Sequence, residues 1–266
     1  MRSVGCVLAM VVGLAAPGLD ACRAEEFESP VKTEVTHYDV CIGKRKVGHM
    51  RLKVMSIKDL VILDEEFVGP FKIRGKTEEA SFESEVVFRG TDKPVPVRGK
   101  VTTSIGTFKL MEGSVEFKPS DAGLAAKAEA TGYADVERKP FDTPRTWEKE
   151  IPAPGDLFLT HAAMLLYAPR LLPKPGKIEN VTQIVFPANF NWPAVITLNP
   201  DCVLERHPTA LDGTAEITLH RVFVGGNIKP LIKMTVDAEG KVVEFTFSDF
   251  VLRPTSILGD SKPADK

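Results

Sequence analysis

His161 is the residue whose setting most favours chemistry, because it lies within an otherwise apolar stretch, Leu157–Ala168. This histidine has two interpretations. In the first, the helix lines a cavity, and His161 binds a ligand or exchanges a proton there. In the second, His161 is only structural: it is hydrogen-bonded to the backbone, or it is the one exposed position of the helix beside Thr160. The second interpretation is the commoner one, since buried polar groups usually have a partner within the protein. We treat His161 as a candidate ligand-binding residue.

A second candidate is the segment Asn189-Phe190-Asn191-Trp192-Pro193, which places two aromatic residues between amides in an expected loop. Loops carry binding residues more often than strands do, and exposed aromatic rings suit binding. Phe190 and Trp192 are therefore candidate ligand-binding residues. The alternative, which is the commoner case, is that the two rings anchor the loop to the core.

Cys41 and Cys202 are the two cysteines that remain if an export signal is removed after Ala24. In an oxidising compartment they could form a disulfide, which would close a loop of about 160 residues and stabilise the fold by about 4–5 kcal/mol. They could equally be two buried thiols that never meet, because the sequence does not fix their separation. Two cysteines without CxxC spacing indicate no metal or redox site.

Catalytic and nucleotide-binding motifs are absent from the sequence, which has no GxSxG, HExxH, CxxC, P-loop or GxGxxG pattern. Gly259-Asp260-Ser261 is similar to the GDS of some esterases but stands in the polar tail, Ser256–Lys266. His37, His49 and His220 are expected on the solvated faces of strands. The sequence therefore predicts a protein that is not an enzyme and has no cofactor or metal.

Composition excludes one class of partner. Of the 266 residues, 43% are hydrophobic and 26% are charged, as in soluble globular proteins. The formal net charge is −2. Because binding to phosphate backbones needs a basic surface, nucleic acid is not an expected partner.

The N-terminus has the pattern of an export signal: Arg2 precedes the apolar run Val4–Leu14, and cleavage is expected after Ala24. The run is too short to span a bilayer, so no transmembrane segment is expected in the mature chain. Alternatively, Leu19-Asp20-Ala21-Cys22 resembles the lipobox of bacterial lipoproteins, in which Cys22 would carry the lipid, although Asp20 departs from that pattern. Both interpretations place the mature protein outside the cytoplasm, in the periplasm, on a membrane or in the medium.

His161 belongs to an expected helix over Asp156–Ala168, with Gly155-Asp156 as its cap and Pro169 as its end. Its apolar residues occupy nearly every angle of the helical wheel. A helix that is apolar all round must be covered on most sides. Thirteen helical residues would be about 20 Å long, too short for a membrane.

Alternating strand patterns precede and follow this helix. The first is a hairpin over Glu34–Val54 with a turn at Gly43–Lys46, and the clearest late one is a hairpin over Thr235–Phe247, closed by Gly240. Other strands are expected at Leu60–Leu63, Phe71–Thr77, Phe82–Phe88, Val97–Thr103, Thr107–Phe117 (with an interruption at Glu112-Gly113-Ser114), 123–135, Val181–Phe186, Ala194–Leu198, Cys202–His207, Thr214–Val224, Leu231–Asp237 and Lys241–Leu252.

The chain resembles periplasmic lipoprotein carriers of the half-barrel type in two features. These are Tyr38-Asp39-Val40 with the Gly43-to-Gly48 turn, and the Val236–Val243 hairpin. The chain is also similar to exported domains of the DUF3108-like group. The resemblance implies no catalytic residues. It implies a mainly β fold: a curled antiparallel sheet, a half-barrel or open barrel, that encloses one apolar α-helix.

We therefore expect residues 25–255 to form a single β-rich domain, followed by a flexible tail at 256–266. The expected function is non-enzymatic binding of a lipid, another hydrophobic ligand or a cell-envelope component, since the helix and strand faces such as Phe245 and Phe247 are apolar. The alternative is a structural or protein-interaction module of the cell envelope. A hydrolase is less favoured because the motifs are missing.

Overall fold

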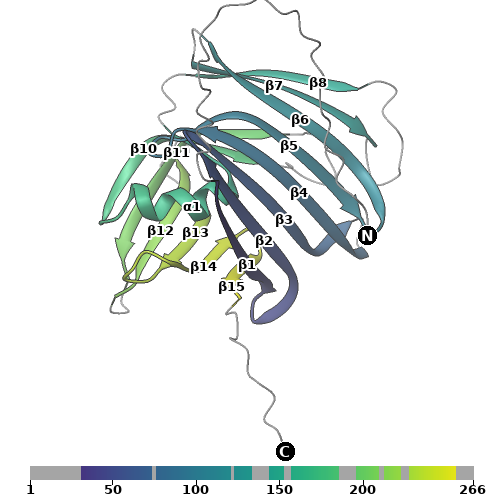
Figure 1. Cartoon of the computed structure of the whole chain (residues 1–266). Coiled ribbons are helices and arrows are strands. Elements are labelled where there is room, and N and C mark those ends of the chain that lie inside the picture. The colour runs from purple at the N-terminus through teal and green to yellow at the C-terminus, as the bar shows by residue number, and fades with distance from the viewer. Residues whose placement is uncertain are drawn as a thin grey trace, which may run out of the picture.

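The structure is a computed structural model that describes residues 31–73, 76–120, 123–133, 144–152, 157–185, 196–209, 213–222 and 228–255. These residues form fifteen strands and one helix (Figure 1). The N-terminal half comprises β1 (Lys32–Ile42), β2 (Arg45–Ile57), β3 (Leu60–Ile73), β4 (Lys76–Arg89), β5 (Val95–Ile105), β6 (Phe108–Ser120), β7 (Gly123–Gly132) and β8 (Arg145–Pro152). The C-terminal half comprises β9 (Leu157–Leu159), α1 (His161–Leu171), β10 (Gly176–Val185), β11 (Thr197–Pro208), β12 (Ala215–Val222), β13 (Ile228–Val236), β14 (Val242–Phe247) and β15 (Phe250–Pro254).

All fifteen strands belong to a single sheet, in the order β8-β7-β6-β5-β4-β3-β2-β1-β15-β14-β13-β12-β11-β10-β9. Neighbours are antiparallel except for β9 and β10, which are parallel. The last strand pairs with the first, with Tyr38 opposite Pro254 and Cys41 opposite Val251. β8 and β9 are the two ends of the strand order, so the sheet is not closed into a barrel. The expected curled antiparallel sheet is confirmed.

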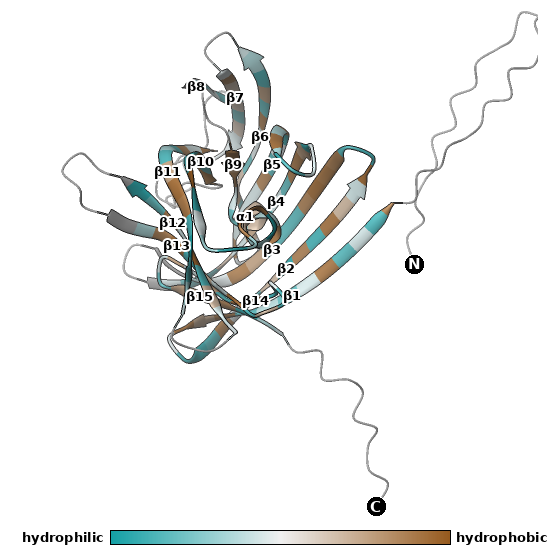
Figure 2. Cartoon of the chain, turned by 90° about the vertical axis from the view of Figure 1, so that its left-hand side faces the viewer, coloured by the Kyte–Doolittle hydropathy of each residue, from teal (hydrophilic) through white to brown (hydrophobic). Residues whose placement is uncertain are grey.

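The sheet curls around α1. Figure 2 looks nearly along the helix and shows it between β3 and β4 on one side and β10 to β13 on the other. The strands alternate as a sheet with one covered face requires. In β6, for example, Val115 and Phe117 are buried, whereas Glu116 and Lys118 are exposed. The helix thus lies on the covered, apolar face, and the prediction of a single enclosed helix is confirmed.

The predicted bounds of the helix were wrong. Leu157–Leu159 form the short strand β9, and Thr160 is the N-cap, whose Oγ1 accepts a hydrogen bond from the amide of Ala163 at 3.0 Å. Gly155-Asp156, the predicted cap, lies outside the described residues. The helix also continues through Pro169 to Leu171. Pro169 has no N–H to donate to the carbonyl of Leu165, so the last turn forms without that one hydrogen bond.

Several strand predictions were also wrong in detail. β3 is one long strand from Leu60 to Ile73, so the predicted strand Phe71–Thr77 spans its connection to β4. β6 continues through Gly113, where an interruption was expected, and its register shift lies instead opposite Thr103 and Ser104. β8 was not predicted. Residues 123–132 are a strand, as expected from their alternation despite their alanine content.

Cys41 and Cys202 are both buried free thiols in this structure, so the hypothesised disulfide is not formed. Cys41 lies in β1 and Cys202 in β11, and the strands β15, β14, β13 and β12 separate them in the sheet. The Cys202 thiol donates to the carbonyl oxygen of Asn199 at 3.4 Å. Of the two alternatives left open by the sequence, the structure has two thiols that do not meet.

His220 corrects another expectation, because it is buried rather than on a solvated strand face. The register between β12 and β13 shifts between Leu219 and His220. A bulge of this kind places two consecutive side chains on the same side of the local ladder, which alternation alone does not predict. His37 and His49 are exposed, as expected.

Gly48 lies on β2 at a point where there is no room for a side chain beside the backbone of β3. A Cβ atom at this position would lie 1.9 Å from the carbonyl oxygen of Val68, on the neighbouring strand β3. We predict that Gly48→Ala lowers the free energy of unfolding by about 1–3 kcal/mol or more, because the backbone of β3 must move. Urea unfolding followed by circular dichroism measures the loss.

Gly176→Ala is the matched control, since its Cβ would meet nothing closer than 3.8 Å. We expect that substitution to change the free energy of unfolding by less than about 0.5 kcal/mol. Equal effects of the two substitutions would contradict the packing of β2 against β3 described above.

Candidate functional site

The predicted residue His161 lies in a group of aromatic side chains, which we call the aromatic cluster: His161, Phe67, Phe245, Phe247 and Phe250. The His161 ring is 4.8 Å from Phe247 and 6.4 Å from Phe245, measured between ring centroids. Phe67 is 5.4 Å from Phe250 and 6.1 Å from Phe247. The rings meet edge-on or tilted, as aromatic pairs prefer.

Four elements bring these rings together. Phe247 and Phe250 face each other across the tight turn between β14 and β15, in which Ser248 adopts a positive φ of 51°. Phe67 projects from the covered face of β3. His161 is the first residue of α1, where the N-cap Thr160 fixes the start of the helix. The cluster therefore depends on β14 and β15 joining the sheet beside β1.

The aromatic cluster has a buried side and an open side. Phe67 and Phe245 are buried in the core. Phe247, Phe250 and His161 are only partly buried and remain in reach of solvent. Partly exposed rings that rest on buried rings form a preorganised apolar surface, which suits a planar or aliphatic ligand group.

His161 contributes a neutral ring to this surface. Loss of hydration lowers the pKa of its imidazole to about 4, so the side chain carries no charge at pH 7. The contacts found for the imidazole are to Phe245 and Phe247. The hydrogen bond to the backbone that the commoner interpretation expected is not seen among the described residues, and His161 instead acts as part of an aromatic surface.

A second unusual group lies on the covered face of β3. Glu65 is buried, and the loss of hydration raises the pKa of its carboxyl to about 7, which a hydrogen bond with Ser84 partly opposes. Ser84 lies directly opposite Glu65 on β4. On β5, the buried Oγ1 of Thr103 has no hydrogen-bond partner among the described residues. These polar groups interrupt an otherwise apolar face.

The structure locates only some of the predicted site residues. It places His161 in the aromatic cluster, whereas Phe190 and Trp192 lie outside the described residues. Phe245 and Phe247 were expected only as part of an apolar strand face. Glu65 was not predicted, although alternation along Leu63-Asp64-Glu65-Glu66-Phe67 puts it on the same face as two buried residues. Within the described residues, no three histidine, cysteine or acidic side chains gather as metal ligands.

Glu65 makes stability depend on pH. Its folded pKa of about 7 lies above the ordinary value of 4.5, so the folded chain binds more protons than the unfolded chain between these values. Stability is therefore lost as the pH rises from about 4.5 through 7. We predict that Glu65→Gln removes this loss and gains about 2.5 kcal/mol relative to the unsubstituted chain on going from pH 5 to pH 8.

Urea unfolding at several pH values measures the difference. Glu83→Gln, on the exposed face of β4, is the control and should change the free energy of unfolding by less than about 0.5 kcal/mol. A Glu65→Gln curve that runs parallel to that of the unsubstituted chain would show that Glu65 does not titrate in this range.

His161 has the opposite pH dependence. Its folded pKa of about 4 lies below the ordinary value of 6.5, so protonation favours the unfolded chain. The stability that the neutral side chain of His161 contributes is present above pH 6.5 and is lost as the pH falls toward 4. We predict that His161→Gln removes at least about 1.4 kcal/mol of acid-induced destabilisation between pH 7 and pH 4.5, whereas the exposed-residue control His37→Gln does not. Urea unfolding at these two pH values tests it, and identical losses in both variants would contradict the lowered pKa of His161.

Comparisons with known proteins found no match for this chain. Neither protein-family models, nor curated proteins, nor solved structures match it. The function must therefore be argued from the geometry above.

Proposed function

We propose that this chain is an exported, non-enzymatic protein that binds a hydrophobic ligand or an apolar part of a cell-envelope component at the aromatic cluster. The observation that carries the proposal is the pairing of Phe247 and Phe250, which are partly exposed while they rest on buried rings. Solvent-exposed aromatic rings held rigidly in this way lose little entropy when a ligand covers them.

The neutral His161 supports the same proposal. A charged imidazole beside Phe247 would have to lose its hydration when an apolar ligand arrives, which costs free energy. Because the pKa of His161 is lowered to about 4, no such cost arises at neutral pH. The cluster is therefore suited to an uncharged, apolar group.

The proposal that the protein is exported rests on the sequence alone, on the apolar run Val4–Leu14 and the expected cleavage after Ala24. The alternative is a lipoprotein anchored through Cys22. These residues lie outside the described part of the chain. The part that is described holds no helix long and apolar enough to cross a membrane.

One observation favours a second function, a structural or protein-interaction module of the envelope. The helix is packed as core on most sides, with Ala162, Ala163, Met164, Leu165, Tyr167 and Ala168 buried. Under this alternative the exposed rings of the aromatic cluster would contact an apolar residue of a protein partner. Cross-linking in cells would then give a specific protein adduct at the cluster.

A titration with N-phenyl-1-naphthylamine, an uncharged aromatic dye that fluoresces in apolar sites, tests the proposed binding. We predict saturable binding to the purified chain at pH 7. Removing both rings in Phe247→Ala/Phe250→Ala should weaken the binding about tenfold or more, since each ring contact contributes about 0.5–1.5 kcal/mol.

Val243→Ala is the matched control, because Val243 lies on the same strand as Phe247 but is 48% exposed and outside the cluster. It should leave the dissociation constant unchanged. Dye binding that the double substitution leaves intact, or that does not saturate, would refute the aromatic cluster as a ligand site.

A further inference from the structure

β1 has an open edge along its first half. On one side it pairs with β2 along its whole length. On the other side β15 pairs only with Tyr38–Cys41, and no described strand lies beside Lys32–Thr36. Figure 2 shows this half of β1 running on beyond β15. An unpaired edge of this kind is a ready template for another strand.

β15 is directed along this open edge, and its hydrogen bonds continue one residue beyond the strand itself. The amide of Thr255 donates to the carbonyl oxygen of His37 at 2.8 Å. In an antiparallel ladder, alternate residues of a strand direct their N–H and C=O groups to the same neighbour. Since His37 faces β15, Thr33 and Val35 direct their backbone groups to the open edge, whereas the residues between them face β2.

The side chains on both faces of the open edge lack a cover. On the outer face, Val31 and Val35 are 54% and 49% exposed, and they are the two most exposed large apolar side chains in the described part of the chain. On the covered face, a cavity of about 70 Å³ lies between β1, β2 and α1, with Glu34, Val54 and Leu166 in its lining. Both faces therefore have room for the side chains of a further strand.

We infer that Ser256–Asp260 extends β15 along this open edge and pairs with Lys32–Thr36. Each pair follows from the last observed one, Tyr38 opposite Pro254, by counting one residue along each strand in opposite directions. No proline interrupts the sequence between Pro254 and Pro263. The segment can therefore donate every backbone hydrogen bond that the open edge can accept.

The side chains of this segment match those of the open edge in the continued register. Ile257 falls opposite Val35 and covers it on the outer face. Leu258 falls on the covered face, where it faces the cavity. Asp260 falls opposite Lys32, and opposite charges in directly paired positions stabilise a sheet. A register shifted by one residue would exchange the two faces and lose all three matches.

The chain's own segment fits the open edge better than a second copy of the chain does. Stable interfaces between proteins bury about 1,200–2,000 Å² in total, far more than the edge of five strand residues provides. A second copy would also lose translational and rotational freedom on binding. Ser256 instead follows Thr255, which is already hydrogen-bonded to β1, so the segment loses only its own conformational freedom. This inference does not rest on the proposed function at the aromatic cluster.

Hydrogen exchange of single amides, measured by NMR on the purified chain and on a chain that ends at Thr255, tests the inference. We expect the amides of Thr33 and Val35 to exchange at least about tenfold more slowly in the full chain, because only the full chain holds their acceptors. The amides of Glu34 and Thr36 face β2 and are the internal control, so they should exchange at the same rate in both chains.

Equal exchange of the Thr33 and Val35 amides in the two chains would overturn the inference. Slow exchange that becomes faster as the protein is diluted would also overturn it, because dilution separates a second copy but not a segment of the same chain.

A pair of cysteines gives a second measurement, which does not depend on whether the shortened chain folds. Thr36→Cys with Ser256→Cys should form a disulfide within one chain, since the two positions are directly opposite in the continued register. Thr36→Cys with Ile257→Cys is the matched control and should form none, because these side chains lie on opposite faces. Equal disulfide formation in both pairs, no disulfide in the first pair, or a disulfide between two chains would contradict the proposed strand.

Discussion

The pairing of β15 with β1 is the interaction on which the rest of the structure depends. It joins residues more than 200 positions apart, from Tyr38 opposite Pro254 to Cys41 opposite Val251. All other described antiparallel neighbours follow one another in the chain, so each half of the sheet could form by successive hairpins. This one long-range pairing turns two sheets into one, and forming it carries the largest cost in loop-closure entropy. Without it, α1 would be covered on one side only, and Phe67 would not meet Phe247 and Phe250.

Polar groups on the covered face of the sheet show where the sequence is not optimised for stability of the core. A core optimised for stability alone would have an apolar residue at position 65, because a buried carboxyl costs free energy that the hydrogen bond with Ser84 only partly offsets. Tyr167 could likewise be phenylalanine if only its ring mattered, since its hydroxyl is unsatisfied. Departures of this kind are expected where function constrains a sequence. Tyr167 lies on α1, the element that bears His161, and Glu65 lies on β3, the strand that contributes Phe67 to the aromatic cluster.

The sequence predicted those features that local alternation determines and missed those that long-range pairing determines. The hairpin of β1 and β2, the strand over residues 123–132 and the enclosed helix follow from periodicity, and the structure has all three. The bulge that buries His220 and the start of the helix at Thr160 rather than Asp156 depend on neighbouring strands, which periodicity does not show. The aromatic cluster combines both cases: the apolar positions of Phe245 and Phe247 were predictable, but their contact with His161 required the strand order.

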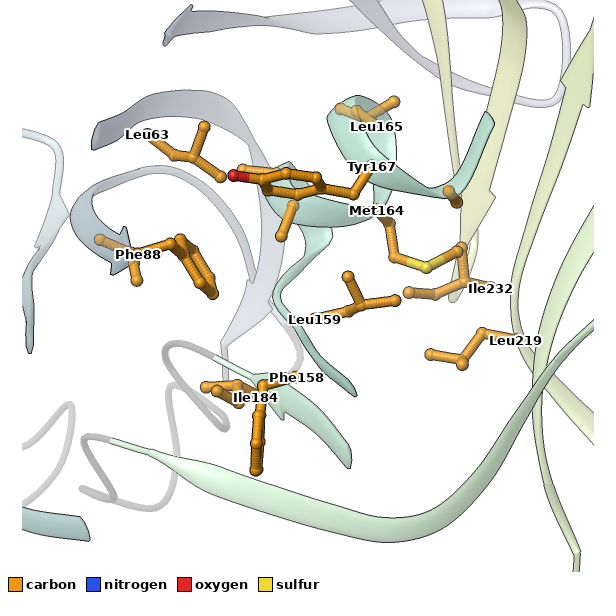
Figure 3. Packing of buried hydrophobic residues seen from close by; sticks show 14 of the residues in the cluster. Leu63, Phe88, Phe158, Leu159, Met164, Leu165, Tyr167, Ile184, Leu219 and Ile232 are labelled. Atoms are coloured by element: carbon orange, nitrogen blue, oxygen red, sulfur yellow. The ribbon is translucent and has the colours of Figure 1, made fainter. Parts of the chain in front are cut away.

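The helix acts as a permanent part of the core rather than as a lid. Met164, Leu165 and Tyr167 are buried, and exposing these three side chains would cost roughly 5–9 kcal/mol, comparable to the whole stability of a typical domain. Figure 3 shows why: Met164 points toward Ile232 of the C-terminal half, whereas Tyr167 points toward Leu63 and Phe88 of the N-terminal half. A helix wedged between both halves of one sheet cannot leave either side without separating them. The ligand site proposed at the aromatic cluster accordingly lies at the N-terminal end of α1 and not beneath the helix.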